Sequence, residues 1–177
     1  SLENYLLPLE ELSLQYLKLL GLASPPDFPP YETESGASQP FQQSQALGDI
    51  SGFYRAFGVE TASGERLDHI SVELEFMYYL TYKEAYARHH HGPAQARLCR
   101  RAQRHFLEQH LGRWAPAFWQ KMEARAQGFY QELARVSQAF LKQEMAQLKA
   151  MPHPLEPQAA AAGQEDDGAG CPWGEIC

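Results

Sequence analysis

The chain has 177 residues, 44% of them apolar, with 15 Lys and Arg against 22 Asp and Glu. This length and apolar content suit one ordinary domain and exclude both a disordered chain and a small disulfide scaffold. Five acidic residues after Met151 carry most of the net charge of −7, so the remaining body is nearly neutral. It lacks the basic footprint that binding to nucleic acid or to an anionic membrane surface requires.

The first predicted element is a short amphipathic helix over residues 8–20, in which apolar residues recur at steps of three and four. Residues 23–45 are predicted to form a long loop, because five prolines remove backbone donors there. Loops of that length within a domain are usually functional. The aromatic residues Phe28, Tyr31 and Phe41 favour a loop that packs or binds.

Two capped helices are expected next. Asp49 can cap a helix that Gly58 ends, and Asp68 can cap a longer helix that runs to about Arg88. Gly92 and the following proline then break the helical pattern.

Residues 93–111 predict another helix, which Gly112 closes. Residues 114–148 show helical periodicity weakened only at Gly128, which we interpret as two consecutive helices with a bend there. No segment has the alternation typical of a strand. The fold class is therefore all-α: a single-domain helical bundle over residues 1–151 with a long Pro-rich loop, followed by a flexible acidic linker and Cys-containing tail over residues 152–177.

The densest polar constellation in an apolar setting is the run Asp-His-Ile-Ser-Val-Glu-Leu-Glu-Phe-Met at residues 68–77. On a helix, His69 and Glu73 share a face, so they could hydrogen-bond, bind a metal as a pair, or act as a base and its orienting group. The simpler interpretation is an N-cap, Asp68, followed by a buried histidine. Neither a nucleophile elbow nor a zinc-spaced second histidine accompanies the pair, so no catalytic residue is assigned.

The chain ends in a segment with two cysteines, Cys171 and Cys177, around a Pro-Trp-Gly-Glu-Ile core. Two thiolates could supply half of a tetrahedral metal or iron–sulfur site. An incidental tail, or a small disulfide loop formed on oxidation, is the simpler alternative. We therefore expect no metal site and no resident cofactor.

Cysteine usage and hydropathy predict where the protein resides. Three cysteines do not make a disulfide framework, which fits a reducing compartment. No run approaches the ~20 apolar residues of a membrane span, and the amino end has no basic patch before an apolar core. A soluble cytoplasmic protein without stable membrane association is expected.

Three stretches, in order, resemble the TorD/DmsD family of maturation chaperones for molybdenum-cofactor oxidoreductases: residues 68–77, residues 106–114 (Phe-Leu-Glu-Gln-His-Leu-Gly-Arg-Trp) and residues 126–134 (Ala-Gln-Gly-Phe-Tyr-Gln-Glu-Leu-Ala). Residues 16–20 and 29–32 resemble that family's aromatic helix and the loop after it. The resemblance covers about residues 9–144. Its structural motif includes Glu73, Phe76, Met77 and Trp114.

The resemblance implies a non-enzymatic, all-helical cytoplasmic chaperone. Its partners would be the apo catalytic subunit of a molybdopterin oxidoreductase and the twin-arginine signal peptide of that subunit, and it would assist cofactor insertion before export. Carried over by position, the residues that line the signal-peptide groove would be Tyr16, Leu19, Leu20, Pro30 and Tyr31, with Asp68 and His69 at its polar end. Paired arginines before an apolar stretch do require an acidic group beside an apolar groove.

Other hypotheses stay open at this point. One is an accessory subunit that remains in the mature oxidoreductase through its Cys tail, and another is a small acid–base enzyme that uses Asp68, His69 and Glu73. A homodimer is compatible with the sequence. The family has further helices before the segment that matches Leu9, so a short amino end and an incomplete groove wall are expected.

Overall fold

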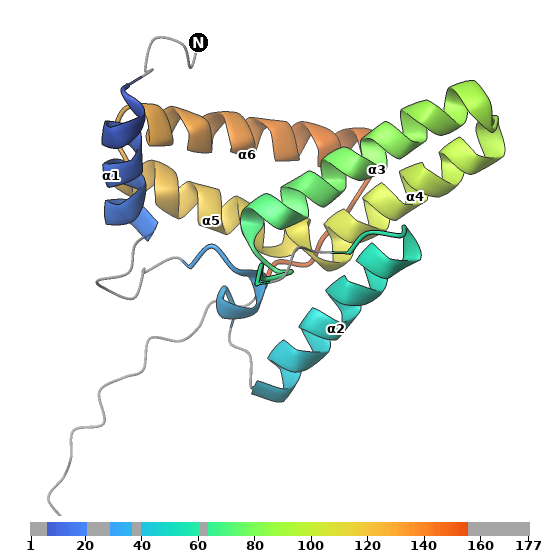
Figure 1. The fold of residues 1–177 in the computed structure, drawn as a ribbon, viewed down its shortest axis with the longest axis horizontal. Coiled ribbons are helices and arrows are strands. Elements are labelled where there is room, and N and C mark those ends of the chain that lie inside the picture. The colour runs from blue at the N-terminus through green and yellow to red at the C-terminus, as the bar shows by residue number, and fades with distance from the viewer. Residues whose placement is uncertain (1–6, 21–28, 37–39, 61–63, 156–177) are drawn as a thin grey trace, which may run out of the picture.

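The computed structural model describes residues 7–20, 29–36, 40–60 and 64–155, and this part of the chain holds six α-helices and no strand (Figure 1). The predicted all-α fold is thereby confirmed. Within the described residues, no helix combines the length and hydropathy needed to cross a membrane. The elements in chain order are α1 (Leu9–Leu20), the 3₁₀ turn η2 (Glu32–Glu34), α2 (Pro40–Ala56), α3 (Ile70–His90), α4 (Pro93–Gln109), α5 (Leu111–Arg125) and α6 (Phe129–Leu148).

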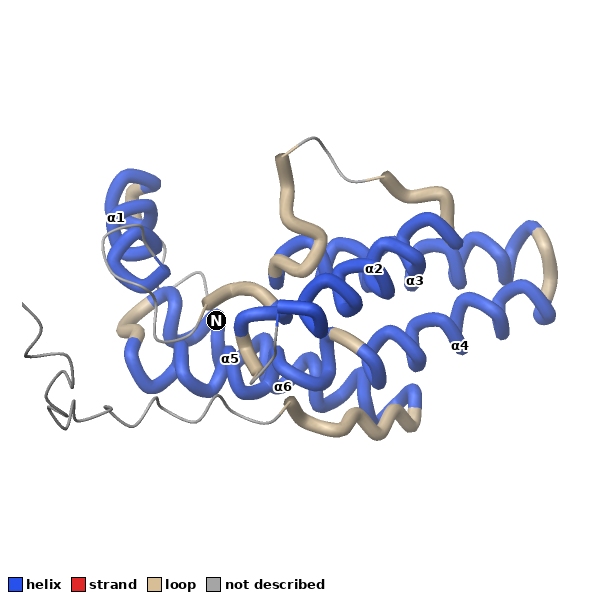
Figure 2. The backbone as a smooth tube through the Cα atoms, turned by 90° about the horizontal axis from the view of Figure 1, so that it is seen from below, coloured by secondary structure: helices blue, strands red, loops and turns tan. Residues whose placement is uncertain are grey.

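The helices form two packed pairs, α3 with α4 and α5 with α6, and α4 also packs against α5 (Figure 1). Helix α1 lies at the far end of the α5–α6 pair in both views (Figures 1 and 2). There the Tyr130 hydroxyl on α6 donates a hydrogen bond to the Leu12 carbonyl, at 3.1 Å. Helix α2 lies beside α4 in Figure 1 and packs against η2.

The core is aromatic where α2, α3 and α4 meet. The Phe76 ring on α3 lies 4.5 Å from that of Tyr54 on α2 and 5.0 Å from that of Phe106 on α4, measured between centroids. Met77 and Trp114 are also buried. The apolar motif residues named from the sequence therefore belong to the packed interior, where apolar burial is the main driving force for folding.

The predicted loop over residues 23–45 is wrong at its carboxyl end, because α2 begins at Pro40. Proline is favoured at the first helical position, where its missing N–H has no helical partner to lose. As a result Asp49 lies within α2 and does not cap it. Residues 23–28 and 37–39 of the expected loop lie outside the described residues.

The predicted cap of α3 is displaced by one residue. His69 is the N-cap, and its Nδ1 accepts a hydrogen bond from the Ser71 backbone N–H, at 3.2 Å. Asp68, which the sequence favours as the cap, is fully buried and serves other partners.

Glycines explain how the last three helices connect. Between α5 and α6 the chain turns back through Gly128, at φ 61°, instead of bending within one helical run, so the two helices pack side by side. Gly112 does not close α4 but lies in the first turn of α5. A Cβ at Gly112 would lie 2.4 Å from the Leu107 carbonyl oxygen. Only glycine therefore allows α5 to follow α4 with a single residue between the two helices.

Residues after α6 remain packed beyond the expected domain boundary at residue 151. The Leu155 N–H donates to the Arg113 carbonyl at 3.1 Å, and the Arg113 Nε donates to the His153 carbonyl at 3.1 Å. The rest of the expected linker, with Cys171 and Cys177, lies outside the described residues.

Candidate functional site

The site is built where the segment before α2 crosses the start of α3. Two backbone hydrogen bonds fix the crossing: Glu32 N–H to the Asp68 carbonyl and Ile70 N–H to the Pro30 carbonyl, both at 2.9 Å. An isolated antiparallel bridge thereby pairs Tyr31 with His69, whose rings lie 5.2 Å apart. Four of the seven residues predicted to bind a signal peptide meet here.

Asp68 is the buried anchor of this crossing. Its Oδ2 accepts hydrogen bonds from the Thr33 hydroxyl at 2.6 Å and from Arg66 Nη2 at 2.9 Å. Burial by itself would raise the pKa of this carboxyl, but the donors from Arg66 and Thr33 outweigh it and hold the pKa below its usual range. Asp68 is therefore ionised, and its carboxylate oxygens already accept hydrogen bonds from Arg66 and Thr33.

Arg66 extends the same cluster to the surface. Its guanidinium also pairs with Glu34 and lies 3.7 Å from the centroid of the Tyr31 ring, in a cation–π contact. Tyr31 and His69 remain half-buried at the rim, whereas Pro30 is buried. Burial lowers the pKa of His69, so its imidazole is neutral near pH 7.

The remaining predicted groove residues, Tyr16, Leu19 and Leu20, lie on α1. Tyr16 is 41% exposed, and its ring lies 6.4 Å from that of Tyr130. Leu19 and Leu20 are partly buried against the core. Helix α1 thus presents an aromatic and aliphatic surface at the end of the α5–α6 pair.

A second polar cluster lies deeper and contains Glu73, which is fully buried. Its Oε2 accepts a hydrogen bond from the Trp114 indole at 3.2 Å, and it interacts with the Glu32 carboxylate. Burial raises the pKa of Glu73 well above its usual range, and the charge of Glu32 raises it further. Both effects favour the protonated form of Glu73.

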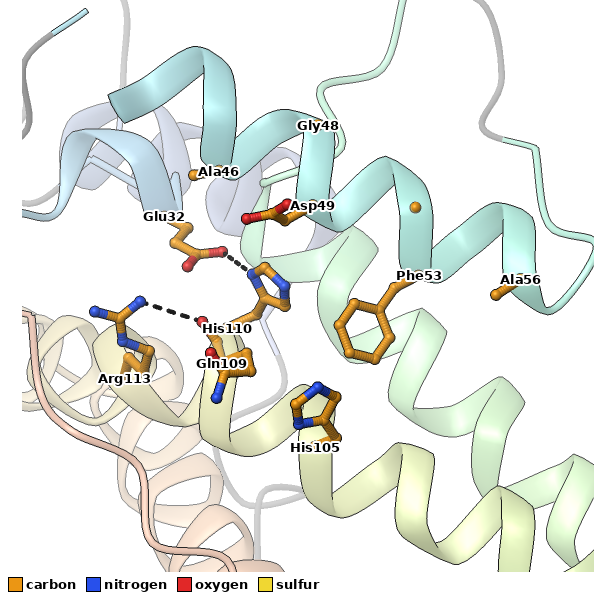
Figure 3. A pocket seen from close by; sticks show the side chains of 11 residues that line it. Glu32, Ala46, Gly48, Asp49, Phe53, Ala56, His105, Gln109, His110 and Arg113 are labelled. Atoms are coloured by element: carbon orange, nitrogen blue, oxygen red, sulfur yellow. Dashed lines mark hydrogen bonds and ion pairs between the residues drawn. The ribbon is translucent and has the colours of Figure 1, made fainter. Parts of the chain in front are cut away.

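Glu32 connects this cluster to a cavity of about 530 Å³ between α2 and the α4–α5 junction (Figure 3). Its Oε2 lies 3.1 Å from Nδ1 of His110, the single residue between α4 and α5. The other ring nitrogen of His110 is buried and has no hydrogen-bond partner among the residues that the structure describes. The walls of the cavity come from η2 (Glu32), α2 (Ala46, Gly48, Asp49, Gly52, Phe53, Ala56) and the junction (His105, Gln109, His110, Arg113).

The residues considered for acid–base chemistry do not act as one unit. Asp68 pairs with Arg66, Glu73 with Trp114 and Glu32, and His69 Nδ1 with the Ser71 hydroxyl at 2.7 Å. Among the described residues, no three His, Cys, Asp or Glu side chains are grouped so that they could hold a metal ion.

Sequence reasoning missed Glu32, Thr33, Arg66 and His110 as members of the site. Glu32 and His110 are 78 residues apart and the Thr33–Asp68 contact joins residues 35 apart, so no local spacing reveals either pair. The only available signal was that Glu32 and His110 fall within stretches that resemble the chaperone family.

Comparison with known proteins identifies the family. A family model described as nitrate reductase delta subunit matches residues 1–120. The chain belongs to this TorD-like family. The resemblance noted in the sequence is thereby confirmed, and residues 30–73 and 110–114 of the site all fall within the matched segment.

Curated relatives of this family member carry the names of assembly proteins. It is 39% identical over 106 residues to the perchlorate reductase assembly chaperone protein of Dechloromonas aromatica, a match that covers 56% of this chain and 46% of that protein. It is 34% identical over 87 residues to the chaperone protein TorD of Vibrio cholerae, covering 49% and 38%. It is 33% identical over 87 residues to the selenate reductase assembly chaperone protein of Thauera selenatis, covering 48% and 44%. The matched segment spans less than half the length of each relative.

Proposed function

We propose that this TorD-family chain is a cytoplasmic, non-enzymatic chaperone that binds the apo catalytic subunit of a molybdopterin oxidoreductase and its twin-arginine signal peptide. In this role it assists cofactor insertion before export. The observation that carries the proposal is the 39% identity over 106 residues to a protein named for the assembly of a perchlorate reductase. Two further relatives bear comparable names.

The surface geometry supports a binding role. A signal peptide presents an apolar helix-forming stretch, and such a stretch docks on exposed aliphatic and aromatic side chains. Helix α1 exposes 57% of Leu14 and 51% of Leu17 beside Tyr16. Tyr31 and His69 offer a second aromatic contact at the crossing.

Within the predicted set, the residues divide by burial. Tyr16, Leu19, Leu20, Tyr31 and His69 are proposed to contact the peptide. Pro30 and Asp68 are buried, so they are proposed to position Tyr31 and His69. The Asp68 side chain is buried against Arg66, so a ligand cannot reach its carboxylate.

Co-purification tests the proposal. The tagged chain is isolated from host cells that make molybdopterin and from a strain that cannot, and the bound protein is identified by mass spectrometry. We expect a molybdopterin oxidoreductase catalytic subunit that still carries its signal peptide, bound in greater amount when the cofactor is missing. A cofactor-loaded oxidoreductase that retains the chain in stoichiometric amount would instead identify an accessory subunit and contradict the proposal.

A further inference from the structure

The cavity between α2 and the α4–α5 junction contains a buried ring nitrogen that no described residue satisfies. His110 is 4% exposed, and its Nδ1 lies 3.1 Å from Glu32 Oε2, an acceptor, so in the neutral tautomer of the ring Nδ1 carries the proton. In that tautomer Nε2 carries a lone pair, and no described residue donates a hydrogen bond to it. In Figure 3 this nitrogen points away from Glu32, toward the side of the cavity where Phe53 lies. A buried acceptor without a donor is costly, and a donor arriving from a ligand removes that cost.

Carboxylates add to the excess of acceptors in the cavity. Glu32 is buried in one wall, and Asp49 on α2 faces the same space with no ion pair or hydrogen bond of its own among the described residues (Figure 3). The arginine of the lining, Arg113, donates to the backbone carbonyls of Gln109 and His153. The cavity therefore favours a ligand with several N–H donors and a positive charge over an anion.

The shape suits a planar cation on a slender stem. Gly48 and Gly52 face open space within the described part of the chain, since a Cβ built on either meets none of its atoms within 4 Å. The half-buried Phe53 ring lies beside this opening, 5.3 Å from the His110 ring, and aromatic faces attract guanidinium groups. The volume of about 530 Å³ lies within the range of small-ligand sites, ~300–1,000 Å³.

We infer that this cavity binds the guanidinium of an arginine side chain, with Glu32, Asp49 and His110 Nε2 as acceptors. The inference rests on the proposed function and deepens it, because it assigns the paired arginines of the signal peptide to a site other than Asp68. A guanidinium offers five N–H donors in a fixed plane, which matches several acceptors around one space better than a lysine ammonium does.

Calorimetric titration tests the inference with the signal peptide of the co-purified oxidoreductase and a counterpart in which lysines replace both arginines. Gly52→Leu fills the cavity in a helix that prefers leucine to glycine, so its thermal unfolding temperature should not fall. Asp49→Asn removes one acceptor charge. Glu75→Gln removes one charge from an exposed site on α3, outside the cavity, and serves as the matched control.

We expect Gly52→Leu to weaken binding of the arginine peptide by about tenfold or more, since a filled pocket excludes its ligand. Asp49→Asn should weaken binding about fivefold, the upper end for an exposed ion pair, and Glu75→Gln should leave it unchanged. The lysine peptide should bind the wild-type chain more weakly than the arginine peptide.

Two results would overturn the inference and leave the proposed function standing: equal affinity of all variants for the arginine peptide, or equal affinity of the wild-type chain for both peptides. Failure of the wild-type chain to bind the arginine peptide at all would overturn the signal-peptide proposal itself, and the inference with it.

Discussion

Asp68 and Glu73 are both fully buried and lie five residues apart, yet the fold shifts their pKa values in opposite directions. Asp68 receives hydrogen bonds from Arg66 and Thr33, and its pKa falls. Glu73 receives one from Trp114 and faces a second carboxylate, Glu32, so burial raises its pKa. The donors and charges that tertiary structure brings to each carboxyl decide its protonation.

The short turn η2 supplies a partner to both carboxyls. Thr33 donates to Asp68, while the adjacent Glu32 interacts with Glu73 and pairs with His110 at the cavity. One three-residue turn therefore links the aromatic crossing at Tyr31 to the proposed arginine cavity. Substitutions of Asp68 and of Glu73 should consequently differ in how far they lower the free energy of unfolding and in how that loss depends on pH.

Asp68→Ala should have the largest effect, a loss of about 3 kcal/mol in the free energy of unfolding, because it removes one partner of a buried ion pair. This loss lies at the low end of what breaking a buried ion pair costs, since the Arg66 side chain can reach solvent. Urea denaturation at pH 7 measures it. Asp68→Asn, which keeps the shape and removes the charge, should recover little of the loss. A loss below about 1 kcal/mol for Asp68→Ala would contradict the anchoring role.

Gly112→Ala should destabilise by about 2 kcal/mol, the size expected for overpacking. The added Cβ collides with the Leu107 carbonyl and pushes α5 outward, which separates Trp114 from Glu73 and leaves the Asp68 cluster intact. Gly52→Ala is the matched control, since its Cβ meets no atom, and its stability should be unchanged or higher. Equal unfolding temperatures for the two variants would contradict the close contact of α5 with α4.

Glu73→Gln should change the free energy of unfolding by less than about 1 kcal/mol at pH 7, because the amide mimics a protonated carboxyl that still accepts from Trp114. The contrast with Asp68→Asn sharpens the comparison between the two carboxyls. Chemical denaturation of both variants side by side measures it. A loss as large as that of Asp68→Asn would show that Glu73 is ionised.

Stability should respond to pH in opposite directions at the two positions. Because folding raises the pKa of Glu73, its contribution to the stability of the fold is fully present below its unfolded pKa of about 4.3. That contribution is lost as pH rises toward the folded pKa. Because folding lowers the pKa of Asp68, its contribution to the stability of the fold is fully present above its unfolded pKa of about 3.9. That contribution is lost as pH falls below this value. Denaturation of Glu73→Gln between pH 5 and about pH 9 should therefore show a smaller alkaline loss than that of the wild-type chain. Identical pH profiles would contradict the assignment.

Much of the fold follows from local patterns in the sequence. The predicted helix that runs to about Arg88 agrees with α3 (Ile70–His90), and Gly128 lies in the turn between α5 and α6. The prediction of a loop at Pro40 is wrong because proline both breaks helices and starts them. The turn back at Gly128 depends on how α5 and α6 pack, which periodicity does not report.

Only part of the site could be predicted from the sequence, because contacts between distant residues decide the rest. Capping rules favour Asp68 as the first residue of a helix, but a donor 35 residues away, Thr33, and the nearby Arg66 draw its carboxylate into the interior. His69, which the rules leave as a core histidine, caps the helix in its place. The cavity joins η2, α2 and the α4–α5 junction, and no local spacing records such a meeting.

Calorimetric titration of the wild-type chain with the signal peptide of its co-purified oxidoreductase tests the central claim most directly. The account predicts saturable binding with a Kd of about 10 μM or tighter, near −7 kcal/mol. The same peptide without its paired arginines should bind at least about tenfold more weakly, a loss of ~1.4 kcal/mol. Absence of heat, together with no competition against a labelled peptide at tens of micromolar, would contradict the claim that this chain receives a twin-arginine signal peptide.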